Sequence, residues 1–289
     1  MTPSARLGAY GIGLVGLDGA RRLLGPVAEG GPDIVVERAA GGDLTLASEV
    51  IDEAHARCGL SGGGWVEMVS DAAESPTVTI RLHQPRAWDD EAVVHPFLAS
   101  SAAVVSRWLG RVAFHAGAFV AGGGAVVILG DKGRGKSSTL GWLATQRVPV
   151  LTDDLVVVAD GQVLVGPRCV DLRPDAAVAL GVGENIGLVG ARERWRFVLP
   201  ECPEPAPLAG WVFPGWADEV SLVRIPARER VPRLFEHLAL RLPPPDPALF
   251  LHLARLPAWE FRRPRGWEHV EPTVARLMEE LLASAPSRA

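Results

Sequence analysis

Residues 125–144 read AVVILGDKGRGKSSTLGWLA, and the expected fold follows from these residues. An apolar run over residues 125–129 leads into the pattern G-x-x-x-x-G-K-S at residues 130–137, and a helical segment is predicted from Lys136 onward. Glycines let such a loop wrap so that backbone N–H groups face phosphate oxygens, and the start of the helix adds its positive end. The sequence therefore predicts a phosphate-binding loop between a buried strand and a helix.

The loop assigns a role to each of its polar residues. Lys136 is expected to reach the β- and γ-phosphates of a nucleotide, and Ser137 to hold Mg²⁺. Only two of the 29 basic residues are lysines, Lys132 and Lys136, and both lie in this loop. A compact ammonium and a planar guanidinium are not equivalent at a phosphate site, so the use of lysine in this loop alone favours a special role for Lys136. The role of Lys132 stays open. The predicted nucleotide contacts are Gly130, Asp131, Lys132, Gly133, Arg134, Gly135, Lys136, Ser137 and Ser138.

An acidic pair, Asp153-Asp154, interrupts the next apolar segment, residues 148–159, which is predicted to be a strand. An acidic residue on the strand beside such a loop is where the Mg²⁺ carboxylate normally lies. Adjacent strand residues point to opposite faces, so only one of the pair can face the phosphates directly. The alternative is a solvated turn, although acids within so apolar a run cost free energy without a partner.

His115 lies in VAFHAGAFV, residues 112–120, a predicted strand that a GGG turn joins to the loop strand as a hairpin. Taken alone, a histidine in such a strand is a hydrogen-bonded core residue as readily as a catalytic one. The three pieces in order, the histidine strand, the glycine loop and the aspartate pair, resemble the catalytic core of the HPr kinase/phosphorylase family. The resemblance covers residues 96–159 and, more loosely, residues 167–175 and 257–261.

This resemblance implies a mixed α/β core like that of phosphoenolpyruvate carboxykinase and transfer of phosphate from ATP, with Mg²⁺, to a serine hydroxyl. One of Asp153 and Asp154 would accept the serine proton and the other would bind the metal; which does which stays open. His115 would orient or support the acceptor side. The family also assembles, so a homo-oligomer is expected.

The chain differs from HPr kinases proper at Ser138, where they have an acidic residue, and at Lys132 and Arg134, where they have small or apolar residues. It is more similar to shorter HPr-kinase-related proteins, some of which accompany lasso peptide pathways and phosphorylate a serine of the precursor peptide. We therefore expect a serine kinase acting on a peptide or small protein. The alternatives are a kinase for a small hydroxylated metabolite and a nucleotide-binding regulator without catalysis.

The remaining sequence predicts an α/β protein of two units. Residues 1–90 read as a small β-rich unit with one helix near residues 47–58, and residues 91–289 as the catalytic unit, which begins with a helix over residues 91–109. Further along, Arg192, Arg194 and Arg196 occupy alternate positions of a predicted strand and share one face. They could clamp a phosphate or an acidic acceptor, or form a solvated edge.

Composition excludes several other classes. The formal net charge is −5 with no basic block, which argues against a nucleic-acid partner. No apolar stretch approaches twenty residues, so no membrane span is expected. Three scattered cysteines, Cys58, Cys169 and Cys202, indicate reduced thiols in a cytoplasmic protein rather than a disulfide framework.

Overall fold

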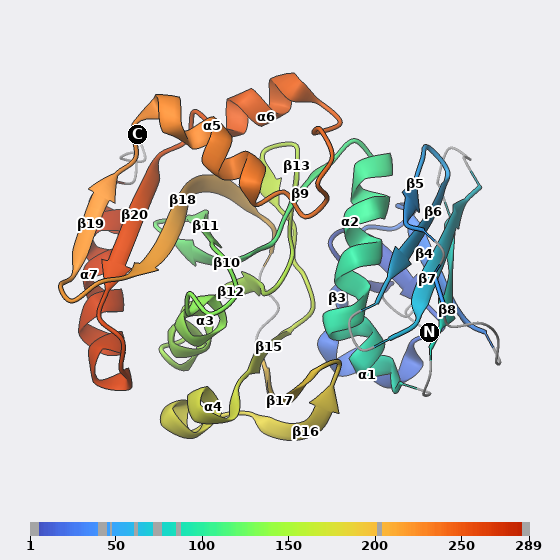
Figure 1. The fold of residues 1–289 in the computed structure, drawn as a ribbon, viewed down its shortest axis with the longest axis horizontal. Helices are drawn as coiled ribbons and strands as arrows, with labels where there is room; N and C mark the ends of the chain where they lie inside the picture. Colours follow the sequence, from blue (N-terminus) through green and yellow to red (C-terminus); the bar gives the residue numbers. More distant parts are fainter. Residues whose placement is uncertain are drawn as a thin grey trace.

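The computed structural model describes residues 6–39, 45–46, 48–60, 63–71, 77–84, 88–200 and 204–284. Its strands form three sheets, with helices between and outside them (Figure 1), so the mixed α/β class is confirmed. None of the helices in these ranges is both long and apolar enough to cross a membrane.

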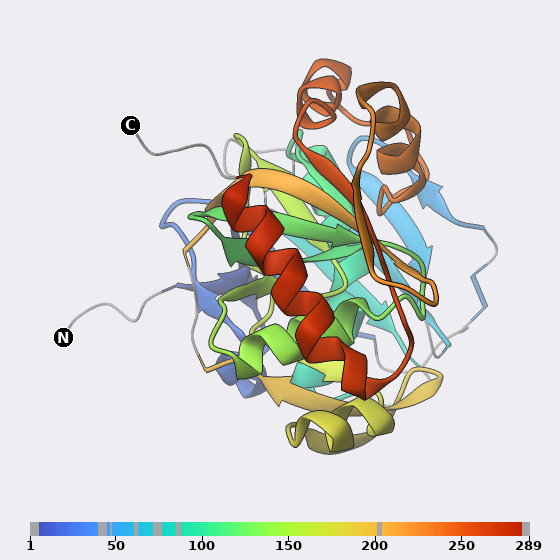
Figure 2. The same ribbon diagram turned by 90° about the vertical axis from the view of Figure 1, so that its left-hand side faces the viewer.

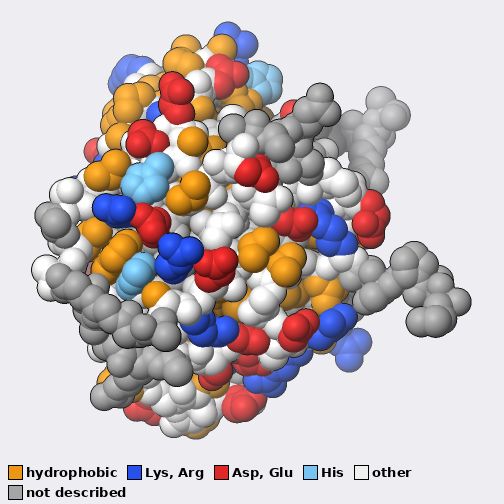
Figure 3. Space-filling view, turned by 90° about the vertical axis from the view of Figure 1, so that its right-hand side faces the viewer, with side chains coloured by type: hydrophobic (Ala, Val, Ile, Leu, Met, Phe, Trp, Pro, Cys, Tyr) orange, Lys and Arg blue, Asp and Glu red, His pale blue; other side chains and the backbone are white. Residues whose placement is uncertain are grey.

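The N-terminal sheet has eight strands in the order β3-β1-β2-β4-β8-β7-β6-β5. Burial alternates along them, since Val66 and Met68 of β7 are fully buried whereas Glu67 between them faces outward. The outer face carries charged, histidine and apolar side chains intermixed (Figure 3). The strands are β1 (Leu7–Ala9), β2 (Ile12–Val15), β3 (Gly25–Pro26), β4 (Asp33–Arg38), β5 (Val50–Ile51), β6 (His55–Gly59), β7 (Trp65–Ser70) and β8 (Thr77–His83), with a short helix η1 (Asp18–Leu23).

The helix predicted near residues 47–58 is wrong. Residue 47 lies outside the described residues, and the rest contains β5 and β6, which pair antiparallel with each other. Ala56 and Cys58 are buried while Arg57 between them is exposed, a period of two that fits pairing with β7. Tertiary pairing here overrides the local helical preference.

Helix α2 (Leu98–Trp108) lies between the N-terminal sheet and the central sheet (Figure 1). It follows α1 (Asp90–Ala92) and η2 (Val93–Phe97), so the helix predicted over residues 91–109 is interrupted near its start. Ala102 and Val105 of α2 belong to the same buried cluster as Met68 of the first sheet and Val157 of the second. The two sheets thus share a continuous core across α2, and the domain boundary at residue 90 stays a prediction.

The central sheet places the glycine loop. Strand β11 pairs antiparallel with β10, as the predicted GGG hairpin requires, and parallel with β18. Alternate residues of β11 serve two layers: Val126 and Ile128 pack towards α3 and α7, and Val127 and Leu129 towards α5 and α6. Figure 2 shows α7 crossing one face of this sheet. The strands of this sheet are β9 (Val112–Phe114), β10 (Ala116–Ala121), β11 (Gly124–Leu129), β12 (Val150–Thr152), β13 (Val156–Ala159), β14 (Gln162–Val163), β18 (Ala206–Trp216), β19 (Ser221–Arg224) and β20 (Ala258–Arg263). The helices that pack on it are α3 (Lys136–Thr145), α5 (Ala227–Glu236), α6 (Pro247–Leu253) and α7 (Val270–Ala283), and the short helix η3 (Trp267–His269) directly precedes α7.

Two predicted strands are each broken at a predicted site residue. The segment 112–120 divides at His115 into β9 and β10, and the segment 148–159 divides at Asp153-Asp154 into β12 and β13. Strand β12 pairs with β10, whereas β13 pairs with β9 and β14. Because the chain changes neighbours at these points, the two breaks lie at the same place in the sheet and bring His115 close to the aspartate pair.

A small third sheet has the order β15-β17-β16. It comprises β15 (Cys169–Leu172), β16 (Glu184–Val189) and β17 (Arg192–Val198), and helix α4 (Pro174–Leu180) follows β15. This sheet lies beside α3 and α4, below the central sheet in Figure 1.

Candidate active site

The glycine loop joins β11 to α3 as predicted. Gly130, Gly133 and Gly135 have φ values of 151°, 88° and 80°, backbone conformations that favour glycine. The ammonium of Lys136 donates to the carbonyl of Gly130 inside the loop. Lys136 is 8% exposed, and burial lowers its pKa, although Asp153 and other nearby acids oppose this. The strand–loop–helix geometry is present, and phosphate binding by it stays a prediction.

A cavity of about 640 Å³ opens beside this loop. Among the predicted site residues, Gly130, Arg134 and Asp153 do not line it. Those that do are His115, Asp131, Lys132, Gly133, Gly135, Lys136, Ser137, Ser138 and Asp154. Most of the predicted set, drawn from three separate stretches of sequence, therefore meets around one space.

The two aspartates occupy different environments. Asp153 is 1% exposed, and burial together with the charge of Asp154 raises its pKa to about 7, while a hydrogen bond with Ser137 acts in the opposite direction. Its Oδ1 atom is buried without a hydrogen-bond partner. An orphaned carboxylate oxygen beside a hydroxyl is a donor set that suits Mg²⁺, so Asp153 and Ser137 fit the predicted ion.

Asp154 differs because it lines the cavity and has a left-handed backbone, with φ of 66°. Burial raises its pKa, but the combined charges of His95, His115, Arg194 and Arg192 outweigh burial, and the net shift is downward. Asp154 is therefore a carboxylate that stays ionised and can be reached from the cavity.

His115 lies at the break between β9 and β10, and its backbone N–H donates to the carbonyl of His237 at 2.9 Å. Partial burial and the charge of Lys136 lower its pKa, while the nearby Asp154 acts in the opposite direction. Its side chain lines the cavity together with Asp154. It is thus not the enclosed core histidine that an unbroken strand would have produced.

Behind Asp154 lies a buried polar network that the sequence did not indicate. His95 Nε2 is 3.7 Å from a carboxylate oxygen of Asp154 and 3.7 Å from one of Asp171. Arg196 donates to Asp171 through Nε at 2.9 Å and Nη2 at 3.1 Å, and also to the carbonyl of His95 at 2.6 Å. Arg194 approaches the same carboxylate at 3.4 Å. The network fixes the charges that surround Asp154.

The three arginines of β17 share one face, as predicted. However, β17 is the middle strand of its sheet, and Arg194 and Arg196 are 7% and 2% exposed. The solvated-edge alternative is therefore wrong for these two. Arg192 and Arg194 line the cavity, whereas Arg196 lies behind them against Asp171.

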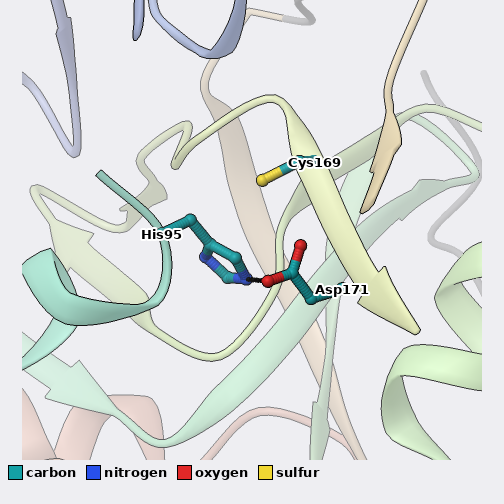
Figure 4. Close-up of side chains that lie close together, drawn as sticks. All are labelled: His95, Cys169 and Asp171. Atoms are coloured by element: carbon teal, nitrogen blue, oxygen red, sulfur yellow. Dashed lines mark ion pairs between the residues drawn. The ribbon is translucent and has the colours of Figure 1, made fainter. Parts of the chain in front are cut away.

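His95, Cys169 and Asp171 bring possible metal-ligand atoms within 4.8 Å of one another (Figure 4). Both carboxylate oxygens of Asp171 already accept hydrogen bonds from guanidinium groups. Burial also raises the pKa of the Cys169 thiol, which favours its protonated form. The guanidinium charges of Arg194 and Arg196 disfavour a cation at this point, so we interpret the cluster as part of the hydrogen-bond network.

Sequence reasoning also missed Trp216 and Arg263, which hold the glycine loop. The indole Nε1 of Trp216 donates to the carbonyl of Gly133 at 3.1 Å. Arg263 Nη2 donates to the hydroxyl of Thr139 at 2.8 Å and to the carbonyl of Gly135 at 3.3 Å. The sequence did contain a signal for Arg263. Along β20, the alternate residues Trp259, Phe261 and Arg263 are buried on one face, so a cation continues an apolar alternation.

No protein-family model and no curated protein matches the chain. Among solved structures, the chain is similar to the Hpr(Ser) kinase/phosphatase from Coxiella burnetii, with 14% identity and a TM-score of 0.27. The match covers 58% of this chain and 98% of that one. At so low an identity and TM-score, it is a distant similarity in fold and says nothing about activity.

Proposed function

We propose that the protein is a kinase that uses ATP and Mg²⁺ to phosphorylate a hydroxyl group, with a serine of a peptide or small protein as the acceptor. The observation that carries the proposal is the meeting of Lys136, Ser137 and Asp154 at one cavity, with Asp153 buried directly beside Ser137. Phosphoryl transfer needs mainly positioning and charge stabilisation, and these residues offer both.

The two aspartates would have different roles because only Asp154 can be reached from the cavity. Asp153, buried beside Ser137, would hold Mg²⁺ with it, and the ion would neutralise charge on the phosphates. Asp154 lines the cavity and would accept the proton of the acceptor hydroxyl. As the hydroxyl oxygen bonds to the γ-phosphorus, the bond to the β–γ bridging oxygen breaks and ADP leaves. Lys136 would exchange the carbonyl of Gly130 for the phosphate oxygens.

A peptide acceptor is supported by the resemblance of the sequence to the short HPr-kinase-related proteins of lasso peptide pathways, which belong to ribosomal peptide natural-product biosynthesis. His115, which lines the cavity together with Asp154, would orient the hydroxyl. The homo-oligomer and the cytoplasmic location stay predictions.

The decisive experiment changes the two aspartates separately to asparagine. Asn tolerates a left-handed backbone, so Asp154→Asn removes the base without straining the chain. We expect its phosphoryl transfer to fall about 10²- to 10⁴-fold while ATP binding is kept. Asp153→Asn is expected instead to weaken Mg²⁺-dependent ATP binding. Asp160→Asn is a matched control, because Asp160 is exposed and also has a positive φ, 50°, in the turn after β13.

Before the acceptor is known, ATP hydrolysis can be measured instead, because water then takes the place of the acceptor hydroxyl. Lys136→Ala should abolish hydrolysis and transfer and greatly weaken ATP binding. Activity that survives in Lys136→Ala would contradict the proposal. Function that survives Asp154→Asn would support a regulator, and phosphorylation of free serine or a sugar but of no peptide would support a metabolite kinase.

A further inference from the structure

The cavity has a second wall that the mechanism above does not use. It is formed by the ends of β18 and β20 and by the segment that follows β20, and it borders the glycine loop. Trp216, Arg263, Arg265 and Trp267 line this wall. Trp216 and Arg263 contact the loop from positions 83 and 128 residues after their partners Gly133 and Gly135, so the sequence pattern does not associate them with it.

Arg263 is a buried cation without a counter-charge. It is 3% exposed, and no carboxylate in the described part of the chain forms an ion pair with it. Its Nη2 atom is held by Gly135 and Thr139, but Nη1 is buried without a hydrogen-bond partner. Burial lowers its pKa to about 10. A buried, uncompensated guanidinium is costly, and an anion beside it would remove that cost.

The loop is shaped around this guanidinium. A Cβ atom on Gly135 would lie 2.6 Å from Arg263 Nη2 and 3.1 Å from the ring of Trp216. Gly135 therefore allows the arginine to approach, besides adopting a φ of 80°. The ring planes of Trp216 and Phe261 lie near the guanidinium carbon of Arg263, at 5.2 and 5.3 Å from their centroids. These contacts orient the cation against the start of α3, where a phosphate would lie.

Flat surfaces continue outward from Arg263 along the wall. The guanidinium of Arg265 lies 5.4 Å from the centroid of Trp216, and Arg265 is exposed. Trp267 is half-buried and lines the same space. Aromatic rings and guanidinium planes are the groups on which nucleic-acid bases stack.

We propose that this wall is the nucleotide subsite, where Arg263 binds the phosphate chain and Trp216, Arg265 and Trp267 contact the base. The inference rests on the proposed function and deepens it. It leaves the wall with Asp154 and Arg192 to the acceptor.

The test compares two ligands by calorimetric titration in the presence of Mg²⁺: ATP, and inorganic tripolyphosphate, which lacks the base and sugar. Arg263→Gln should weaken both by about tenfold or more, because it removes a charged hydrogen-bond donor. Arg265→Gln and Trp267→Leu should weaken ATP about five- to tenfold and leave tripolyphosphate unchanged. Arg262→Gln is the matched control, since Arg262 is exposed on the same strand and pairs with Glu260 at 3.0 Å.

The outcomes separate this inference from the proposed function. If the wild type binds neither ligand, the proposed function fails. If the wild type binds both, Lys136→Ala does not, and the Arg263 and Arg265 variants match the wild type, then the nucleotide subsite is wrong while the kinase assignment stands. Should Arg263→Gln fail to fold by circular dichroism, Arg263→Lys keeps the charge and loses the planar fork, and unchanged tripolyphosphate affinity in it would overturn the phosphate contact.

Discussion

The ion pair between Arg196 and Asp171 gives the sharpest test of how the site is held. Both side chains are 1% exposed, and Arg196 makes two hydrogen bonds to the carboxylate, at 2.9 and 3.1 Å. Arg196→Met keeps most of the volume but leaves Asp171 with only the longer hydrogen bond from Arg194, at 3.4 Å, and with His95 Nε2 at 3.7 Å. Breaking a buried pair from one side costs about 3 to 5 kcal/mol, because an uncompensated charge remains.

Such a loss is a large share of the 5 to 15 kcal/mol that stabilises a typical protein. At roughly 2 °C per kcal/mol for a chain of this size, the melting temperature should fall by about 6 to 10 °C. Thermal unfolding followed by circular dichroism measures this shift, and urea titration measures the free energy of unfolding. The site should suffer as well, because Arg196 also anchors the backbone of His95 beside Asp154.

Two companion variants test whether the uncompensated charge of Asp171 causes this loss. Arg22 pairs with Glu91 near the surface and its side chain is 48% exposed, so Arg22→Met should cost no more than about 1 kcal/mol. The double variant Arg196→Met with Asp171→Leu removes both charges, and it should be more stable than Arg196→Met alone. If Arg196→Met melts within 2 °C of the wild type, or if the double variant is the less stable of the two, the charge argument is wrong.

Three further predictions follow from single positions. Gly135→Ala should weaken ATP binding strongly, as measured by calorimetry, because its Cβ would lie 2.6 Å from a guanidinium nitrogen of Arg263. Gly161→Ala is the control, because Gly161 also has a positive φ, 72°, but has open space around it. This control should lose about 1 kcal/mol of stability in thermal melting and should bind ATP as the wild type does. Gly117→Ala places a Cβ 2.3 Å from the end of the Leu140 side chain, so the free energy of unfolding in urea should drop by about 1 to 3 kcal/mol. Hydrogen bonds from Arg57 and His55 lower the pKa of the Glu67 carboxyl, so Glu67→Gln should lower stability at pH 7 by at most about 1 kcal/mol. The urea midpoints of the variant and the wild type should converge as the pH falls through the folded-state pKa, and a gap that does not narrow on acidification would contradict this.

The local parts of the fold could be predicted from the sequence because their signals are local. The glycine loop, the strand before it and the helix after it follow from spacing and periodicity, as does the hairpin at residues 122–124. The helix expected near residues 47–58 failed because the partner strand β7, not the segment itself, decides its conformation. Strand pairing depends on contacts distant in sequence, which periodicity alone does not reveal.

From the sequence alone, one lysine, one serine, one histidine and an acidic pair could be predicted as a phosphoryl-transfer site by their types and order. The different environments of the two aspartates became visible only in the folded chain. Asp153 is buried beside Ser137, and Asp154 lines the cavity in front of His95. The tertiary structure also brought Trp216 and Arg263 to the loop from strands far along the chain. Residue types and their spacing can be recognised within a short segment, whereas the burial of a group and the charges around it depend on residues from distant segments that pack against it.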